Sequence, residues 1–239
     1  MIFTRATGLG ESKAFLEQAL ASGKFPHALL LHGPEGAGQN ALLLDLADIL
    51  LCESAGTRPC GACRACLQSR TGNSERIHFL LPLESSSGDD ERKSVEGDQL
   101  EELTEKIPVF LGDPYGYRLS ERGLIRIAQA RDLQTKLGYA GATLKSRVVL
   151  IPWAERFQTE AANALLKTLE EPPPGTYFLL STSNRKAVLQ TILSRCTGLP
   201  VSALDDEAFA AAVAARKAWW DGAPPDRLLP FAEGSLGAL

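Results

Sequence analysis

The chain has 239 residues, of which 44% are hydrophobic and 23% charged; these are ordinary values for a globular protein of one or two domains. The formal net charge of −4 excludes a protein that is basic overall, but it does not exclude a local basic patch. No apolar run reaches the roughly 18–20 residues of a membrane helix, and the N-terminus lacks an apolar signal core, so we expect a cytoplasmic protein with no membrane partner.

The first part of the chain predicts a helix, a strand, a glycine-rich loop and a second helix. Residues 11–21 carry apolar side chains at helical spacing, and residues 28–32 form a short apolar run typical of a buried strand. The sequence GPEGAG follows, and residues 40–51 are strongly helical. A strand, a glycine loop and a helix in this order open an α/β nucleotide-binding fold. Residues 77–81 predict a further strand.

The later elements alternate between helices and strands up to about residue 201, which predicts a mostly parallel sheet. The polar residues 84–98 predict a mobile loop, and residues 99–122 contain a short helix followed by turn formers. The remaining predicted elements are helix 127–138 ending at Gly138, strand 147–151, helix 158–171, strand 177–182 and helix 188–193. From residue 203 the pattern is helical only, so we expect a domain boundary near 201–204 and a helix over 205–221.

The glycine-rich loop has the pattern of a phosphate-binding loop. Gly33, Gly36 and Gly38 would let backbone N–H groups converge on phosphate oxygens at a helix N-terminus. A working loop ends in Lys and then Ser or Thr, which hold the phosphates and Mg²⁺, whereas Gln39 and Asn40 stand at these positions. A turn that joins a strand to a helix without any ligand explains the glycines equally well.

The carboxylate that normally supports Mg²⁺ is also missing. It should follow a later strand, but strand 147–151 is followed by Pro152 and Trp153, and the first acid is Glu155. Two independent parts of the catalytic apparatus are therefore absent together. We expect no ATP hydrolysis by the isolated chain, and nucleotide binding stays open.

Four of the five cysteines predict a metal site. Cys52, Cys60, Cys63 and Cys66 have the spacing C-x₇-C-x₂-C-x₂-C, and four thiolates can complete a tetrahedral Zn²⁺ site. The alternative is a set of four unrelated buried cysteines, which the short spacing in a polar segment disfavours. The cluster contains no His or Asp, which favours a structural zinc module at about residues 52–70 over a catalytic site.

Three stretches carry a resemblance to a known family: HALLLHGPEGAG, VVLIPWAERFQTEAANALLKTLEEPP and FLLSTSNRKAVLQTILSRC. They resemble the AAA+ clamp-loader subunits of bacterial DNA polymerase III, and NALLKTLEEPP and Ser194-Arg195-Cys196 are the most specific parts. The resemblance covers residues 25–70 and 124–201 well. It implies an AAA+ core at residues 1–201, with a parallel sheet flanked by helices, and a partial helical lid at 202–239.

Within this family, Gln39, Asn40, Pro152 and Trp153 resemble the delta-prime branch, which typically has a degraded loop. The resemblance implies a stator that helps place the sliding clamp on primed DNA, as one component of the DNA polymerase holoenzyme. Its partners would be motor subunits and a clamp-opening subunit in a hetero-oligomer. The family's arginine finger lies in the Ser-Arg-Cys motif, so Arg195 is expected to reach the ATP of a neighbouring subunit. The family's zinc module also lies in the region of the four cysteines.

Two alternatives remain at this point. An active motor ATPase of the same architecture would have Lys at position 39 and an acid at 152 or 153, and neither is present. A zinc-containing nucleic-acid-binding module on an inert scaffold belongs to a different class and would bind DNA with a steep salt dependence.

The chain also departs from the family. The region 72–123 is longer than the connection in many members, and the role of the insertion within it, at about 84–121, stays unassigned. The family usually has a C-terminal collar domain that this chain lacks, so we expect an N-terminal fragment or a short member. The final GSLGAL resembles the start of a lid helix without its nucleotide-sensing arginine. We interpret His27, His32 and His78 as structural, and Glu170 and Glu171 as exposed charge.

Overall fold

The computed structural model describes residues 1–84, 95, 97–139, 146–215 and 234–236. A parallel sheet of five strands forms its centre, in the order β2-β3-β4-β1-β5. The strands are β1 (Ala28–His32), β2 (Ile77–Phe79), β3 (Arg147–Ile151), β4 (Thr176–Thr182) and β5 (Thr197–Pro200). The predicted α/β fold with a parallel sheet is confirmed.

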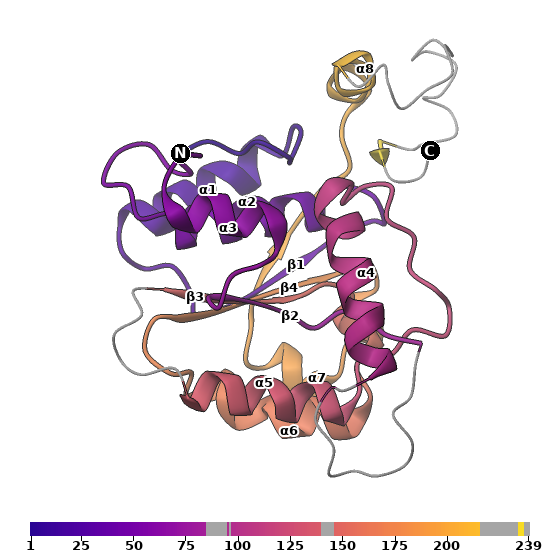
Figure 1. The fold of residues 1–239 in the computed structure, drawn as a ribbon. Helices are drawn as coiled ribbons and strands as arrows, with labels where there is room; N and C mark the ends of the chain where they lie inside the picture. The colour runs from indigo at the N-terminus through magenta and orange to yellow at the C-terminus, as the bar shows by residue number, and fades with distance from the viewer. Residues whose placement is uncertain (85–94, 96, 140–145, 216–233, 237–239) are drawn as a thin grey trace.

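Helices cover both faces of the sheet (Figure 1). One face carries α1 (Gly10–Ala21), α2 (Gln39–Leu51) and α3 (Arg64–Thr71), and the other carries α5 (Ile127–Tyr139), α6 (Thr159–Glu170) and α7 (Gln190–Leu193). Helix α4 (Asp98–Gly112) packs against α3, and α8 (Asp206–Ala215) follows β5. Two short 3₁₀ turns, η1 (Ala154–Arg156) and η2 (Arg185–Ala187), follow β3 and β4. Within these described residues, no helix is both long enough and apolar enough to span a bilayer.

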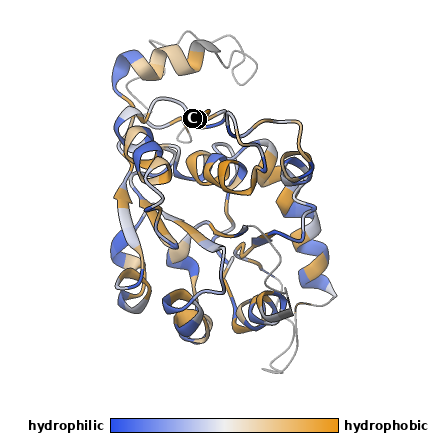
Figure 2. Cartoon of the chain, turned by 90° about the vertical axis from the view of Figure 1, so that its left-hand side faces the viewer, coloured by the Kyte–Doolittle hydropathy of each residue, from blue (hydrophilic) through white to orange (hydrophobic). Residues whose placement is uncertain are grey.

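The side chains of alternating strand residues pack into two separate hydrophobic cores. Leu29 and Leu31 of β1 pack into the core shared with α2, whereas Ala28 and Leu30 pack into the core shared with α5 and α6. This alternation follows from the pleat, which points successive side chains to opposite faces. Figure 2 shows the result: the strands in the middle are mostly hydrophobic, and the surrounding helices carry both kinds of residue. Both faces of the sheet are therefore buried, as a parallel sheet requires.

Several boundaries differ from the prediction. Helix α5 continues through Gly138, because burial of Leu133 and Leu137 outweighs the roughly 1 kcal/mol that a helical glycine costs. Helix α4 is 15 residues long rather than short. Strand β5 and helix α3 were not predicted. The predicted loop at 84–98 and the lid helix at 205–221 lie partly outside the described residues, and α8 covers 206–215 of the latter.

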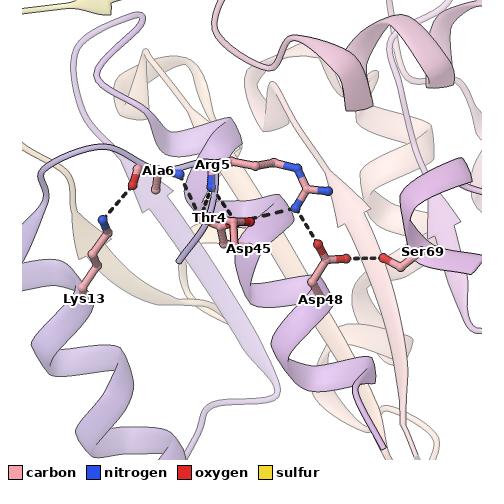
Figure 3. Close-up of polar contacts among 7 residues, drawn as sticks. All are labelled: Thr4, Arg5, Ala6, Lys13, Asp45, Asp48 and Ser69. Carbon is pink, nitrogen blue, oxygen red and sulfur yellow. Dashed lines mark hydrogen bonds and ion pairs between the residues drawn. The ribbon is translucent and has the colours of Figure 1, made fainter. Parts of the chain in front are cut away.

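A buried carboxylate on α2 fixes the N-terminal segment (Figure 3). Asp45 is fully buried and accepts hydrogen bonds from Thr4 Oγ1 at 3.0 Å, the N–H of Arg5 at 3.0 Å and the N–H of Ala6 at 2.8 Å. A buried charge is tolerated when donors of this kind surround it. The segment before α1 is thus tied to the helix that leaves the glycine loop.

A second carboxylate, one turn later on α2, extends the same network to α3 (Figure 3). Asp48 accepts a hydrogen bond from Arg5 Nη1 at 2.5 Å and another from the hydroxyl of Ser69. Helix α2 begins directly after Gly38 and is followed directly by Cys52. The network therefore fixes the cysteine segment relative to the glycine loop.

Candidate functional site

The glycine loop connects a strand to the N-terminus of a helix, as the sequence predicts. It leaves β1 after His32 and enters α2 at Gln39. Gly36 and Gly38 have φ angles of 71° and 103°, a left-handed region that strains any residue with a side chain. The backbone of the loop therefore requires glycine at positions 36 and 38.

Both side chains at the end of the loop bond to the chain itself. Gln39 is 6% exposed, and its Nε2 donates a hydrogen bond to the carbonyl of Pro34 at 2.6 Å. Asn40 Oδ1 accepts a hydrogen bond from the hydroxyl of Ser181, at the end of β4, at 2.6 Å. Neither side chain brings a positive charge to the loop, and both polar groups already have partners.

Aromatic side chains from distant segments cover the open side of the loop. The hydroxyl of the buried Tyr115, from the insertion, lies 2.9 Å from where a Cβ on Gly38 would stand. Trp153 stands after β3, where a working ATP site has a carboxylate that supports Mg²⁺. The ring centroids of Trp153 and Tyr117 are 5.3 Å apart. The cavity left beside the loop measures about 40 Å³, whereas small-molecule sites typically measure about 300–1,000 Å³. Sequence reasoning missed this cover.

Two further segments close around the loop. Leu9 and Trp153 have φ angles of 59° and 57°, so both adopt left-handed backbone conformations that non-glycine residues rarely take. Leu9 also lies 3.4 Å from the Cβ position of Gly38. From the predicted lid, the hydroxyl of Ser235 donates a hydrogen bond to the carbonyl of Glu35. The N-terminal segment and the residues near the C-terminus therefore both contact the loop region.

The four predicted cysteines converge on one point. The Sγ atoms of Cys52, Cys60, Cys63 and Cys66 all lie within 4.8 Å of one another, and those of Cys60 and Cys66 are 4.0 Å apart. A tetrahedral zinc site with Zn–S bonds of about 2.3 Å needs sulfur atoms about 3.8 Å apart. All five cysteines of the chain are free thiols. The four clustered cysteines could therefore bind a metal ion.

Backbone N–H groups point at the sulfur atoms of this cluster. The N–H of Cys60 lies 3.4 Å from Cys52 Sγ, and that of Cys63 lies 3.3 Å from Cys60 Sγ. The N–H groups of Ala62 and Cys63 lower the pKa of Cys60 to about 6, whereas burial raises the pKa of Cys66 to about 12. A bound metal ion deprotonates its thiol ligands outright, so the high pKa of Cys66 is no obstacle.

Arg195 lies between α7 and β5, and its own chain holds it. Its Nη2 pairs with Glu170 Oε1 at the end of α6, and its Nη1 donates hydrogen bonds to the carbonyl of Thr191 at 2.9 Å and to Ser194 Oγ at 3.3 Å. The side chain of Arg195 is 25% exposed and that of Glu170 is 50% exposed. Glu170, predicted as exposed charge, is thus half exposed and paired. Cys196 packs against the core below the sheet, and burial raises its pKa to about 12.

The three histidines that we interpreted as structural lie apart from one another and form no common site. Nε2 of His27 lies 3.1 Å from the carbonyl of Leu169. Burial lowers the pKa of His78 to about 4, and burial together with Arg185 lowers the pKa of His32. Among the described residues, the four cysteines are the group arranged for a metal.

Comparison with known proteins adds independent findings. Residues 9–205 match a family model described as "DNA polymerase III, delta subunit". The chain is 30% identical over 192 residues to DNA polymerase III subunit delta' of Haemophilus influenzae, covering 80% of this chain and 47% of that protein. It is 32% identical over 193 residues to subunit tau of Escherichia coli, covering 80% of this chain and 24% of that protein. The chain thus spans about half the length, or less, of the curated relatives it matches.

One solved structure supports the fold. A variant of RuvB from Thermotoga maritima aligns with a TM-score of 0.50 and 14% identity, covering 99% of this chain and 62% of that chain. At this identity the likeness concerns the fold alone. It agrees with a parallel sheet covered by helices on both faces.

Proposed function

The chain belongs to the family described as "DNA polymerase III, delta subunit", and from this premise we propose that it is a stator of the delta' type in a clamp loader. It would help to load the sliding clamp onto primer-template DNA in the cytoplasm. Its partners would be motor subunits and a clamp-opening subunit in a hetero-oligomer. Relatives named delta' and tau are about equally similar to it, so the choice between stator and motor rests on the glycine loop.

The filled, uncharged glycine loop is the observation that carries this proposal. Phosphoryl transfer depends on groups that neutralise developing charge, above all a lysine and a bound Mg²⁺. Here Gln39 and Asn40 are bonded to Pro34 and Ser181, and Trp153 stands after β3 in place of a carboxylate. The remaining cavity of about 40 Å³ is much smaller than the roughly 300–1,000 Å³ of a typical small-molecule site, which argues against nucleotide binding. These features support a subunit that takes part in loading without hydrolysing ATP.

Steady-state phosphate release by the isolated chain tests this assignment. We expect no ATP turnover above a control without protein, with or without primed DNA. A variant Gly38→Trp, which blocks the loop, should give the same background rate and so reports contamination. Robust Mg²⁺-dependent release that this variant abolishes would contradict the stator assignment and support the motor.

We also propose that Arg195 serves the ATP site of a neighbouring motor subunit. A planar guanidinium can bind phosphate oxygens in a bidentate manner. The glycine loop of this chain lacks the lysine and the hydroxyl of a working ATP site, so Arg195 would serve the site of a neighbouring subunit. The motif Ser194-Arg195-Cys196 leaves the side chain 25% exposed at the surface. In the isolated chain the guanidinium pairs with Glu170, and in the complex it would exchange this carboxylate for phosphate oxygens.

Reconstituted complexes test the role of Arg195. An arginine finger is worth roughly 10³–10⁵ in rate at the site it serves, and the summed rate should fall less because other sites continue. We expect Arg195→Ala to assemble normally but to slow DNA-stimulated ATP hydrolysis, and Arg195→Lys to rescue it poorly. Arg185→Ala, an exposed arginine on η2, is the matched control. A fully assembled Arg195→Ala complex that hydrolyses ATP and loads clamps at the parental rate would remove this role.

For the cysteine cluster we propose one structural Zn²⁺. Four sulfur ligands within 4.8 Å of one another leave no open position for a substrate, which supports a metal that stabilises the fold. Filter binding to primed and unprimed DNA separates this proposal from a zinc-containing nucleic-acid-binding module. The isolated chain should bind both weakly, whereas tight binding with a steep salt dependence would favour the nucleic-acid-binding module.

A further inference from the structure

We propose that the insertion gives the glycine loop a built-in occupant: Tyr115 and Tyr117, together with Trp153, fill the space of a nucleotide and hold the loop closed. These three side chains are called the aromatic plug below. The proposal gives the insertion at 84–121 a role. It concerns the isolated chain, so it does not depend on whether Arg195 serves a neighbour.

Tyr115 is the part of the plug that contacts the loop. Its hydroxyl and Cε1 lie 2.9 Å and 3.4 Å from the Cβ position of Gly38, and the residue is 6% exposed. The hydroxyl accepts a hydrogen bond from the N–H of Thr7 at 3.0 Å. A buried tyrosine hydroxyl needs such a partner. One side chain therefore joins the glycine loop to the N-terminal segment.

A tight turn after α4 presents Tyr115 in this position. Asp113 Oδ1 accepts hydrogen bonds from the N–H of Tyr115 at 3.2 Å and from that of Gly116 at 2.9 Å. The carbonyl of Asp113 accepts a further one from the N–H of Tyr117 at 3.0 Å. Aspartate bonds of this kind fix a turn locally. A defined turn thus positions the two tyrosines of the plug.

Aromatic packing anchors the other two members of the plug. Phe110 of α4 is fully buried, and its ring centroid lies 5.6 Å from that of Tyr117 and 5.6 Å from that of Trp153. Trp153 keeps a left-handed backbone with φ of 57°. A conformation of this kind costs about 1–3 kcal/mol and persists when the surrounding packing enforces it. The packing of Trp153 on Phe110 and Tyr117 provides that enforcement.

The space that remains is too small for a ligand. The cavity of about 40 Å³ is lined by Gly36, Gly38, Tyr115 and Trp153, among others, whereas sites that bind small molecules typically measure about 300–1,000 Å³. We expect the parent chain to bind nucleotide poorly, and two explanations for this expectation compete. Either the missing lysine and hydroxyl suffice, or the plug excludes the nucleotide even when that chemistry is present.

Four forms of the 239-residue chain separate these explanations. The first is the parent, and the second carries Gln39→Lys and Asn40→Ser, which restore the chemistry beneath an intact plug. The third carries Tyr115→Ala and Tyr117→Ala, and the fourth carries all four changes. Tyr177→Ala, added to the second form, is the matched control because Tyr177 packs on Phe25 away from the loop. The readout is equilibrium binding of a fluorescent ATP analogue with Mg²⁺, and circular dichroism confirms folding.

We expect the fourth form to bind the analogue at least roughly tenfold more tightly than the second form or the Tyr177 control. If restoring Lys and Ser alone gives the same affinity as the fourth form, the plug is no barrier and the proposal fails. It fails equally if the fourth form folds and binds no better than the second.

A second measurement needs no variant and remains decisive if the tyrosine changes prevent folding. The amides of residues 33–38 in the parent should be protected from hydrogen exchange without nucleotide, because the plug already covers them. Millimolar ATP should leave that protection unchanged. Fast exchange in the parent that ATP slows would show that nucleotide enters the loop, and would overturn the proposal.

Discussion

Replacing Asp45 by Asn should lower the free energy of unfolding by about 3 kcal/mol. The carboxylate is fully buried and accepts hydrogen bonds from Thr4 Oγ1 and from the N–H groups of Arg5 and Ala6. An Asn of the same shape keeps one oxygen but turns an NH₂ group toward these donors. Hydrogen bonds to charged groups contribute about 1.5–3 kcal/mol each. The expected loss of stability lies near the lower end of the range for broken buried ion pairs. The reason is that Arg5 Nη1 still pairs with Asp48 Oδ2, 2.5 Å away.

Urea unfolding at pH 7, followed by circular dichroism, measures this change as a shift of the midpoint at constant m. The matched control is Asp132→Asn in α5, whose carboxylate lies 2.7 Å from Lys136, a side chain that is 55% exposed. An ion pair of this kind, four positions apart on a helix, is worth about 0.3–0.5 kcal/mol. If Asp45→Asn costs no more than the control, the buried network does not stabilise the N-terminal segment and our account of it is wrong.

Two further predictions concern the metal and pH. Protein purified without added zinc should contain about one equivalent of Zn²⁺ by metal analysis. The zinc content should be lower in Cys63→Ser and unchanged in Cys196→Ser. A zinc content near zero in the reduced parent would contradict the site. Burial lowers the pKa of folded His78 to about 4, below its unfolded value of about 6.5, so the unfolded chain binds a proton first as the pH falls. Stability should therefore decrease between about pH 6.5 and 4, and His78→Gln should lessen that decrease in urea unfolding; equal pH slopes for parent and variant would refute it.

The fold and the cysteine cluster were predictable because each rests on a local pattern. The apolar runs of β1 and β3 and the periodic helices between them specify an α/β sheet without any long-range information. Four cysteines within one short segment specify a common ligand point in the same way. Strand β5 was not predicted because Thr197–Pro200 contains one glycine and one proline and buries only Leu199. It is a strand because it pairs with β1.

The buried carboxylates of α2 and the aromatic plug were not predicted from the sequence, for different reasons. Asp45 and Asp48 stand three positions apart in the otherwise apolar sequence QNALLLDLADILL, a pattern that signals buried polar groups and could have been found. Tyr115 had no such signal. Its hydrogen-bond partner Thr7 lies 108 residues away, and the two tyrosines in this segment of turn formers are too few to establish a period. Contacts of this kind become visible only when the chain is folded.

If the chain binds no nucleotide, as we propose, the buried network and the aromatic plug would keep the fold intact without it. A nucleotide that binds only the folded state stabilises it by RT ln(1 + [L]/Kd), about 2.7 kcal/mol at a hundred times Kd. In this chain, Tyr115 joins the loop to the N-terminal segment, and Asp45 joins that segment to α2. Both contacts belong to the chain and do not vary with ATP concentration. In the proposed stator, these contacts would hold in one arrangement the region that opens and closes around nucleotide in a motor.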